Sequence, residues 1–98
     1  MKKLAPIHPG EVLAEDYLAP IGMSGNALAL ALRVPANRLS DIIRGKRGIT
    51  ADTALRLSRY FGTSAQFWMG LQTQYDLAIE ADANEARIKR EVPVRLAS

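Results

Sequence analysis

The 98-residue sequence has no cysteine and only one histidine. Without cysteine there can be no disulfide, thiolate metal ligand or cysteine nucleophile, and a single histidine is too few for the usual multi-histidine zinc sites. Long apolar runs are also missing, since none approaches the roughly 18 residues that a membrane-spanning helix needs. We therefore expect a soluble, cytoplasmic protein that holds neither a metal nor another cofactor.

Export and catalysis are disfavoured as well. The start, Met-Lys-Lys, resembles the charged part of a secretion signal, but Pro6, Pro9 and Glu11 interrupt the apolar segment that would have to follow. A chain of this size forms one small domain with little room for a deep substrate cavity. No Ser-His-Asp set, phosphate-cradling loop or pair of carboxylates can be assembled from it, so we expect no catalytic residues and no enzyme.

Positive charge is concentrated in the middle of the chain. Residues 33–59 contain seven basic and two acidic side chains, whereas the segments before and after them each carry a net charge of −1. A cationic segment between near-neutral flanks is typical of proteins that bind a polyanion, and nucleic acid is the first candidate. The alternative is a protein-interaction module whose basic patch is incidental.

Five sets of helix signals follow one another along the sequence. Serine or threonine at a cap, proline at the first helical position and glycine after the last turn are the signals used. Strand alternation is absent, so the sequence predicts an all-α fold. The five helices are expected to start at His8, Ser24, Pro35, Thr50 and Ser64 and to end at Pro20, Leu32, Gly45, Gly62 and about Ala81.

The segment after Asp82 differs from the rest. Helical potential continues until Pro93, but a sustained apolar face is missing. We expect a folded domain over residues 1–82 and a C-terminal tail over residues 83–98 that is frayed or becomes ordered on a partner.

The helix expected between Pro35 and Gly45 has two different faces. Leu39, Ile42 and Ile43 recur at helical spacing and are expected to face the core. A short helix that presents hydrogen-bonding side chains on its other side fits the major groove of DNA. That outward stripe consists of Asn37, Ser40, Asp41 and Arg44, with Arg38 on its flank.

Several of these residues have a second interpretation. Asn37 either reads adenine or supports the start of the helix, and Asp41 either accepts from cytosine or pairs with Arg44, which is slightly favoured. The N–H groups capped by Ser24 and the basic loop at residues 44–47 suit phosphates. His8 is expected to be a helix cap and not a metal ligand.

The fifth helix carries an apolar stripe that is wider than a core requires. Core packing accounts for most of the stripe, but the excess, together with Leu30 and Ala31 of the second helix, predicts a homodimer or partner contact. A dimer would place two recognition helices about 34 Å apart, as a palindromic site requires. The expected surface consists of Trp68, Met69, Leu71, Tyr75 and Ile79.

Five blocks of sequence, spread over roughly residues 7 to 80, form a specific combination. They read His8-Pro-Gly-Glu-Val-Leu, Asn26-Ala-Leu-Ala, Val34-Pro-Ala-Asn-Arg-Leu, Arg44-Gly-Lys-Arg-Gly-Ile-Thr-Ala-Asp-Thr-Ala-Leu-Arg-Leu and Tyr60-Phe-Gly-Thr-Ser-Ala-Gln-Phe-Trp. Together they resemble the HigA-type antitoxins, a branch of the λ-repressor-like (XRE) helix-turn-helix proteins. The resemblance implies a five-helix domain that dimerises, binds an inverted-repeat operator at its own promoter and neutralises a HigB-type toxin, a ribosome-dependent mRNA endonuclease.

The resemblance also implies roles for individual positions. Arg33 stands where the family usually has glycine, so we expect a positive φ at a non-glycine residue there. A stand-alone regulator without a toxin is the alternative function. Base reading is expected from Ala36, Asn37 and Asp41, with Arg38 and Ser40 beside them, and phosphate binding from Ser24, Asn26, Arg44, Lys46 and Arg47.

Overall fold

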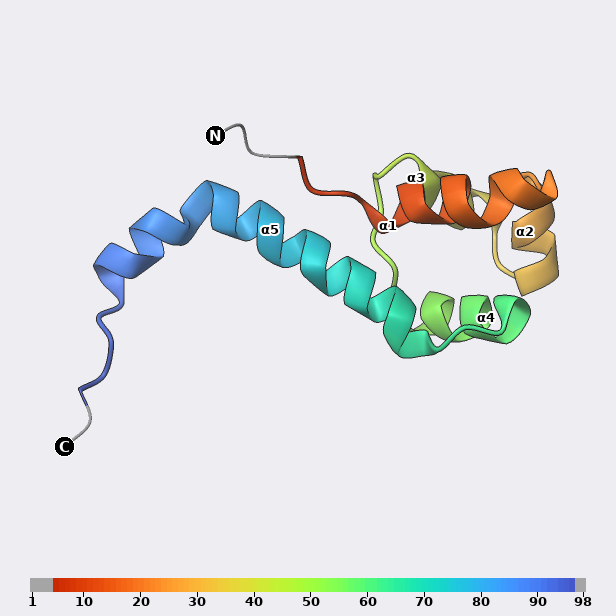
Figure 1. Cartoon of the computed structure of the whole chain (residues 1–98). Coiled ribbons are helices and arrows are strands. Elements are labelled where there is room, and N and C mark those ends of the chain that lie inside the picture. The colour runs from red at the N-terminus through yellow and green to blue at the C-terminus, as the bar shows by residue number, and fades with distance from the viewer. Residues whose placement is uncertain (1–4, 97–98) are drawn as a thin grey trace.

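The computed structural model describes residues 5–96, which form five helical segments and no strand. In Figure 1 the first four segments make up the body of the molecule, and the later turns of α5 project away from it. The all-α prediction is confirmed. The first segment comprises α1 (Pro9–Val12), a π-helical stretch η1 (Leu13–Leu18) and a 3₁₀ turn η2 (Ala19–Ile21), and it is followed by α2 (Gly25–Leu32), α3 (Ala36–Ile43), α4 (Ala51–Phe61) and α5 (Ala65–Glu91).

The predicted caps begin the helices. The hydroxyl oxygens of Ser24, Thr50 and Ser64 each accept a hydrogen bond from the backbone N–H three residues further on. His8 caps α1, where its Nδ1 accepts from the N–H of Gly10 at 2.9 Å. Burial lowers the pKa of His8, which keeps the ring neutral and leaves Nδ1 a lone pair for this bond.

Two helix ends differ from the predictions. Pro20 does not close the first segment, which continues to Ile21 and ends where Gly22 adopts a left-handed φ of 63°. Proline is tolerated early in a 3₁₀ turn because its missing N–H has no intrahelical partner there. No helix within residues 5–96 is long and apolar enough to cross a membrane.

The fifth helix continues beyond Ala81 to Glu91. Ion pairs one turn apart support this extension, with Lys89 Nζ 3.5 Å from Glu85 Oε1 and a further pair at Arg87. The helix ends where Val92 becomes extended, because the following proline disfavours helical geometry at the preceding residue. The helix crosses the boundary placed at residue 82, and the division into domain and tail stays a prediction.

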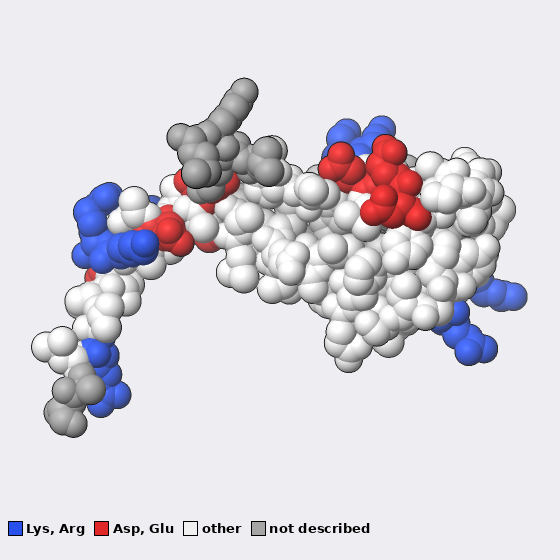
Figure 2. Space-filling model, in the orientation of Figure 1, with Lys and Arg blue, Asp and Glu red and all other residues white. Residues whose placement is uncertain are grey.

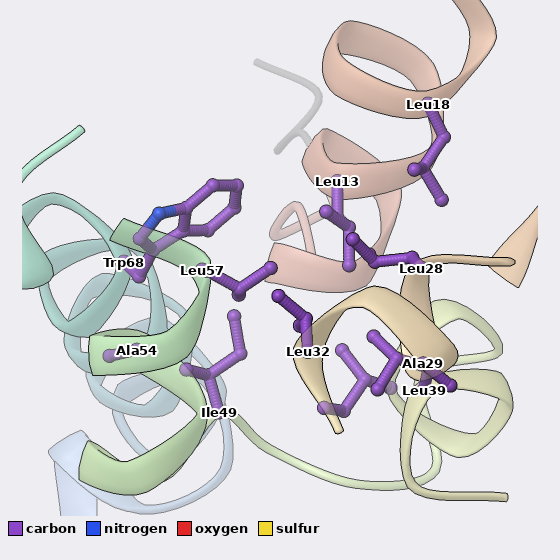
Figure 3. Close-up of a cluster of buried hydrophobic side chains, with 11 residues drawn as sticks. Leu13, Leu18, Leu28, Ala29, Leu32, Leu39, Ile49, Ala54, Leu57 and Trp68 are labelled. Carbon is purple, nitrogen blue, oxygen red and sulfur yellow. The ribbon is translucent and has the colours of Figure 1, made fainter. Parts of the chain in front are cut away.

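One hydrophobic cluster joins all five segments, as the side chains in Figure 3 show. Burying these aliphatic and aromatic side chains is the main favourable contribution to folding. The cluster draws on α5 at a single residue, so the later turns of that helix lie outside the core. Its members are Leu13, Leu18, Leu28, Ala29, Leu32, Leu39, Ile42, Ile49, Ala54, Leu57 and Trp68.

Trp68 lies inside this core and not on a contact surface. It is fully buried, and its Nε1–H donates to Thr63 Oγ1 at 2.7 Å. Its ring centroid lies 4.9 Å from that of Tyr17 and 5.0 Å from that of Phe67. The prediction that Trp68 belongs to a dimer or partner surface is therefore wrong, because this ring closes the core between η1 and α5.

The first helix crosses α3 so closely that no side chain fits at Gly10. A Cβ atom there would lie 1.8 Å from the carbonyl oxygen of Ile42. We predict that Gly10→Ala separates α1 from α3 and lowers the free energy of unfolding by about 3 kcal/mol, measured by urea denaturation. Gly70→Ala is the matched control, because nothing lies within 4 Å of a Cβ at Gly70.

In a helix interior with free space, replacing glycine by alanine stabilises by about 0.5–1 kcal/mol. Gly70→Ala should therefore be slightly more stable than the wild type. If Gly10→Ala were as stable as the wild type, the close crossing of α1 and α3 would be contradicted.

Candidate nucleic-acid interface

A tight turn sets α2 against α3. Arg33 occupies the left-handed region at φ 59°, as expected, and this conformation costs a non-glycine residue about 1 kcal/mol. The N–H of Val34 donates to the carbonyl oxygen of Ala29 at 3.0 Å, which closes the turn. Because Ala29 is small and buried, the two helices can pack closely.

The two faces of α3 lie as the sequence predicts. Leu39 and Ile42 are fully buried, whereas Ala36 and Asn37 at the start of the helix are exposed. Ser40 is half-buried, and its hydroxyl donates to the backbone carbonyl of Asn37 at 3.3 Å. Within residues 5–96 the side-chain amide of Asn37 has no hydrogen-bond partner, so it is free to bind a ligand.

Arg38 connects α3 to α4. Its Nη1 donates to Asp52 Oδ2 at 2.6 Å, and the same carboxylate accepts from Arg56 Nε at 3.0 Å. Arg56 in turn donates to the carbonyl oxygen of Leu32 at the end of α2. This chain of bonds holds α2, α3 and α4 together at one edge of the polar face.

A basic loop follows α3. Arg44, Lys46 and Arg47 are all exposed, and Gly45 takes the left-handed conformation that reverses the chain. Asp41 lies between two of the cations, with Oδ1 3.4 Å from Arg44 Nη2 and Oδ2 3.7 Å from Arg47 Nη2. The pairing of Asp41 with Arg44 is confirmed. Lys46 has no ion-pair partner in the described part of the chain.

The start of α2 lies beside the end of α3. A Cβ on Gly25 would be 3.0 Å from Ile43 Cδ1, so the N-terminal turn of α2 touches the last turn of α3. Ser24 and Asn26 are exposed at this place. The structure therefore brings the N–H groups at the start of α2, the polar stripe of α3 and the basic loop to one surface, which we call the α3 surface.

Charge is divided between different faces of the molecule. The face toward the viewer in Figure 2 carries acidic side chains over the first helical segment, whereas Lys and Arg of the body appear only at its margins. The projecting part of α5 carries acidic and basic side chains next to one another. The exposed acids of the first segment are Glu11, Glu15 and Asp16. A polyanion is thus directed to the α3 surface and away from the acidic face.

A groove of about 640 Å³ lies between α2 and α4. The sequence pointed only to its α2 side, through Ala31, and not to the residues of α4. The apolar members of the groove include Ala31, Leu55, which is 62% exposed, and Tyr60. Arg56 and Arg59 also line it. The signal that could have found the α4 side of the groove is Leu55 itself, since this apolar residue cannot face the core together with Ala54 and Leu57.

The remaining residues of the expected contact surface on α5 are more open than Trp68. Met69, Leu71 and Tyr75 are half-buried, and Ile79 is 44% exposed. Leu71 and Tyr75 line a mainly apolar groove together with Ile7 and other residues of the N-terminal segment. Their role in a dimer or partner contact stays a prediction.

The α2–turn–α3 unit with its polar recognition face defines a helix-turn-helix protein, and the sequence profile of the helix-turn-helix family matches residues 15–68. Virulence-associated protein I of Dichelobacter nodosus is 51% identical over 92 residues, which cover 94% of this chain and 84% of that protein. Antitoxin HigA-1 of Vibrio cholerae is 36% identical over 76% of this chain and 70% of its own length.

A solved structure of Pseudomonas aeruginosa antitoxin HigA with the higBA promoter superposes with a TM-score of 0.91 and is 52% identical. The alignment covers 93% of this chain and 99% of that one. The chain belongs to the HigA antitoxins, a family of helix-turn-helix proteins.

The ion pairs of Asp52 predict a pH dependence of stability. Hydrogen bonds from Arg38 and then Arg56 hold the pKa of Asp52 below its usual 3.8. Because the folded-state pKa is depressed, the contribution is fully present above pH 3.8 and is lost as the pH falls through the lower folded value. We expect Asp52→Asn to be less stable than the wild type at about pH 7 and to approach it at about pH 2.5 in urea unfolding. A difference that is the same at both pH values would contradict the pairing.

Proposed function

We propose that this protein is the antitoxin of a type II toxin–antitoxin pair, which represses its own operon as a homodimer on an inverted-repeat operator and neutralises a HigB-like mRNA endonuclease. It acts without catalysis or cofactor, in the cytoplasm where its DNA and its toxin are. The single observation that supports this most strongly is the α3 surface, where a free Asn37 amide, the start of α2 and a basic loop converge.

On DNA, α3 enters the major groove with Asn37 toward the base edges. A side-chain amide can donate to and accept from adenine at once, and the structure leaves this amide free. Arg44, Lys46, Arg47 and the N–H groups at the start of α2 bind phosphates on either side of the groove. Asp41 holds Arg44 and Arg47 in place, and Arg38 keeps α3 fixed on α4.

The groove between α2 and α4 is the proposed contact for a second copy. Ala31, Leu55 and Tyr60 offer exposed apolar area of the kind that a dimer buries. Asp52 lines this groove and also bonds to Arg38 on α3, so the groove lies next to the recognition helix. Two copies joined here would present both recognition helices to the same duplex. Half-sites about 34 Å apart, one turn of the DNA, require such an arrangement.

The toxin is proposed to bind the acidic face. An enzyme that cleaves mRNA on the ribosome must itself carry positive charge to approach RNA. The face seen in Figure 2 carries acids on the first segment and on α5, with basic side chains beside the acids of α5. The apolar groove formed by Ile7, Leu71 and Tyr75 lies between the N-terminal segment and α5. Charge complementarity therefore favours this face over the arginine-lined groove between α2 and α4.

The DNA interface is tested by removing one charge at either of two lysines. Three to four phosphate contacts per subunit give a slope of log K against log salt of roughly −5 to −7 for a dimer. Lys46→Ala should weaken binding to operator and random duplexes alike and reduce the slope by about two per dimer. Lys89→Ala also removes one positive charge, but from the far end of α5. It should leave both the affinity and the salt slope unchanged. Fluorescence anisotropy at several salt concentrations measures this.

Asn37→Ala provides the contrasting result in the same assay. The variant should lose about 1–3 kcal/mol of the free-energy difference between the correct and a wrong base at one position of the operator. Its affinity for random DNA should change little. Equal losses on operator and random DNA would remove Asn37 from the base-reading residues. A wild-type slope near zero, or equal effects of Lys46→Ala and Lys89→Ala, would overturn the α3 surface as the DNA interface.

One substitution in the proposed dimer groove and one in the proposed toxin surface test the two assignments independently. Leu55→Glu places a charge in the groove between α2 and α4 and should convert the dimer to a monomer in sedimentation experiments. Ile7→Arg, in the apolar groove of the proposed toxin surface, should leave the dimer intact and weaken the complex with the small protein encoded beside this one. The opposite pattern would exchange the two assignments. If the neighbouring protein forms no complex and does not impair growth when produced alone, the chain is a stand-alone regulator.

A further inference from the structure

A side chain of α5 holds the basic loop. The backbone N–H of Ile49, at the end of the loop, donates to Gln72 Oε1 at 2.7 Å. This bond joins residues that are 23 positions apart, and it is partly buried. It is a direct polar link between α5 and the segment that carries Lys46 and Arg47.

The same amide packs against the loop backbone. A Cβ atom on Gly48 would lie 3.0 Å from both Cδ and Nε2 of Gln72. Glycine at this position therefore lets the loop lie flat on the Gln72 side chain. Contact and hydrogen bond together define where the loop can run.

Asp76 fixes the orientation of this amide. Gln72 Nε2 donates to Asp76 Oδ1 at 2.9 Å, one helical turn further along α5. Because a carboxylate can only accept, the NH₂ group must point to Asp76 and the oxygen to Ile49. The two bonds of Gln72 thus support each other.

The first half of the loop does not need this support. The N–H groups of Arg44, Gly45 and Lys46 donate to carbonyl oxygens in α3 at 2.8–3.0 Å. Beyond Lys46, within the described chain, Ile49 provides the next hydrogen-bonded backbone N–H, and it bonds to Gln72. The backbone of Arg47 and Gly48 is therefore held at both ends, by the bonds to α3 before it and by the bond to Gln72 after it.

We propose that Gln72 is a positioning residue for DNA binding, which sets the phosphate-binding geometry of residues 46–48 from α5 without touching the DNA. The proposal rests on the assignment of the basic loop to phosphate binding. Phosphate contacts depend on placement within a few tenths of an ångström, so a loop released at Ile49 binds less well although it keeps all its charges.

The test compares two substitutions on α5. Gln72→Met keeps the length of the side chain but removes the acceptor and the donor, whereas Gln66→Met makes the same change at an exposed position of the first turn. We expect Gln72→Met to weaken operator binding about tenfold and to reduce the salt slope by about two per dimer. Gln66→Met should match the wild type in both. A residue with a merely structural role would lower the melting temperature and leave the salt slope unchanged.

A double variant keeps the test decisive if Gln72→Met folds poorly. Gln72→Glu combined with Asp76→Asn conserves the net charge. It reverses the direction of the hydrogen bond between positions 72 and 76. The carboxylate introduced at position 72 then accepts both from the N–H of Ile49 and from the amide introduced at position 76. This variant should restore affinity and slope to within about threefold of the wild type.

The possible failures are distinguishable. If the wild type binds no operator duplex, the proposed function fails whatever Gln72 does. If the wild type binds and Gln72→Met binds with the same affinity and salt slope, only the positioning role is overturned. Failure of the double variant to recover, with its fold intact by circular dichroism, would overturn it as well.

Discussion

Burial of Leu39 and Ile42 is the contact on which the interface depends. These two side chains fix the rotation of α3 about its own axis, and the absence of a side chain at Gly10 lets α1 press α3 into place. With the aliphatic stripe inside, Asn37 has to face solvent. A change that rotated α3 would remove the polar stripe from the α3 surface even if every residue of the stripe were unchanged.

The second constraint is repulsion among the closely spaced basic side chains. Two carboxylates reduce this repulsion by forming ion pairs with them. Asp41 bridges Arg44 and Arg47, and Asp52 accepts from Arg38 and Arg56. These exposed pairs add little to stability but order long, flexible side chains before a ligand arrives. The hydrogen bond from the N–H of Ile49 to Gln72 holds the basic loop in a similar way. Because Gln72 is uncharged, it leaves the positive charge of the loop available.

Local signals in the sequence predicted most of the fold. The caps at Ser24, Thr50 and Ser64 and the two faces of α3 each depend on residues within one or two turns, so spacing alone reveals them. The left-handed conformation of Arg33 was expected only from the resemblance, because the family usually has glycine at this position. The burial of Trp68 was missed because helical periodicity identifies an apolar stripe but not which of its members is enclosed.

Long-range partners could not be predicted in this way. The bond from Arg38 to Asp52 spans 14 positions and the bond from Ile49 to Gln72 spans 23, and both exist only because the helices pack as they do. The groove at Leu55 arises from the same packing. The extension of α5 to Glu91 uses the helical potential that the sequence has up to Pro93, and ion pairs one turn apart support it where no apolar face continues.

The most direct test of the central claim is hydrogen–deuterium exchange of the full chain with and without its promoter duplex. We predict that DNA slows exchange at residues 24–27 and 36–49, with no change over residues 80–91, where α5 projects from the body. Slowed exchange confined to α5, with residues 36–49 unaffected, would contradict the assignment of the α3 surface to DNA.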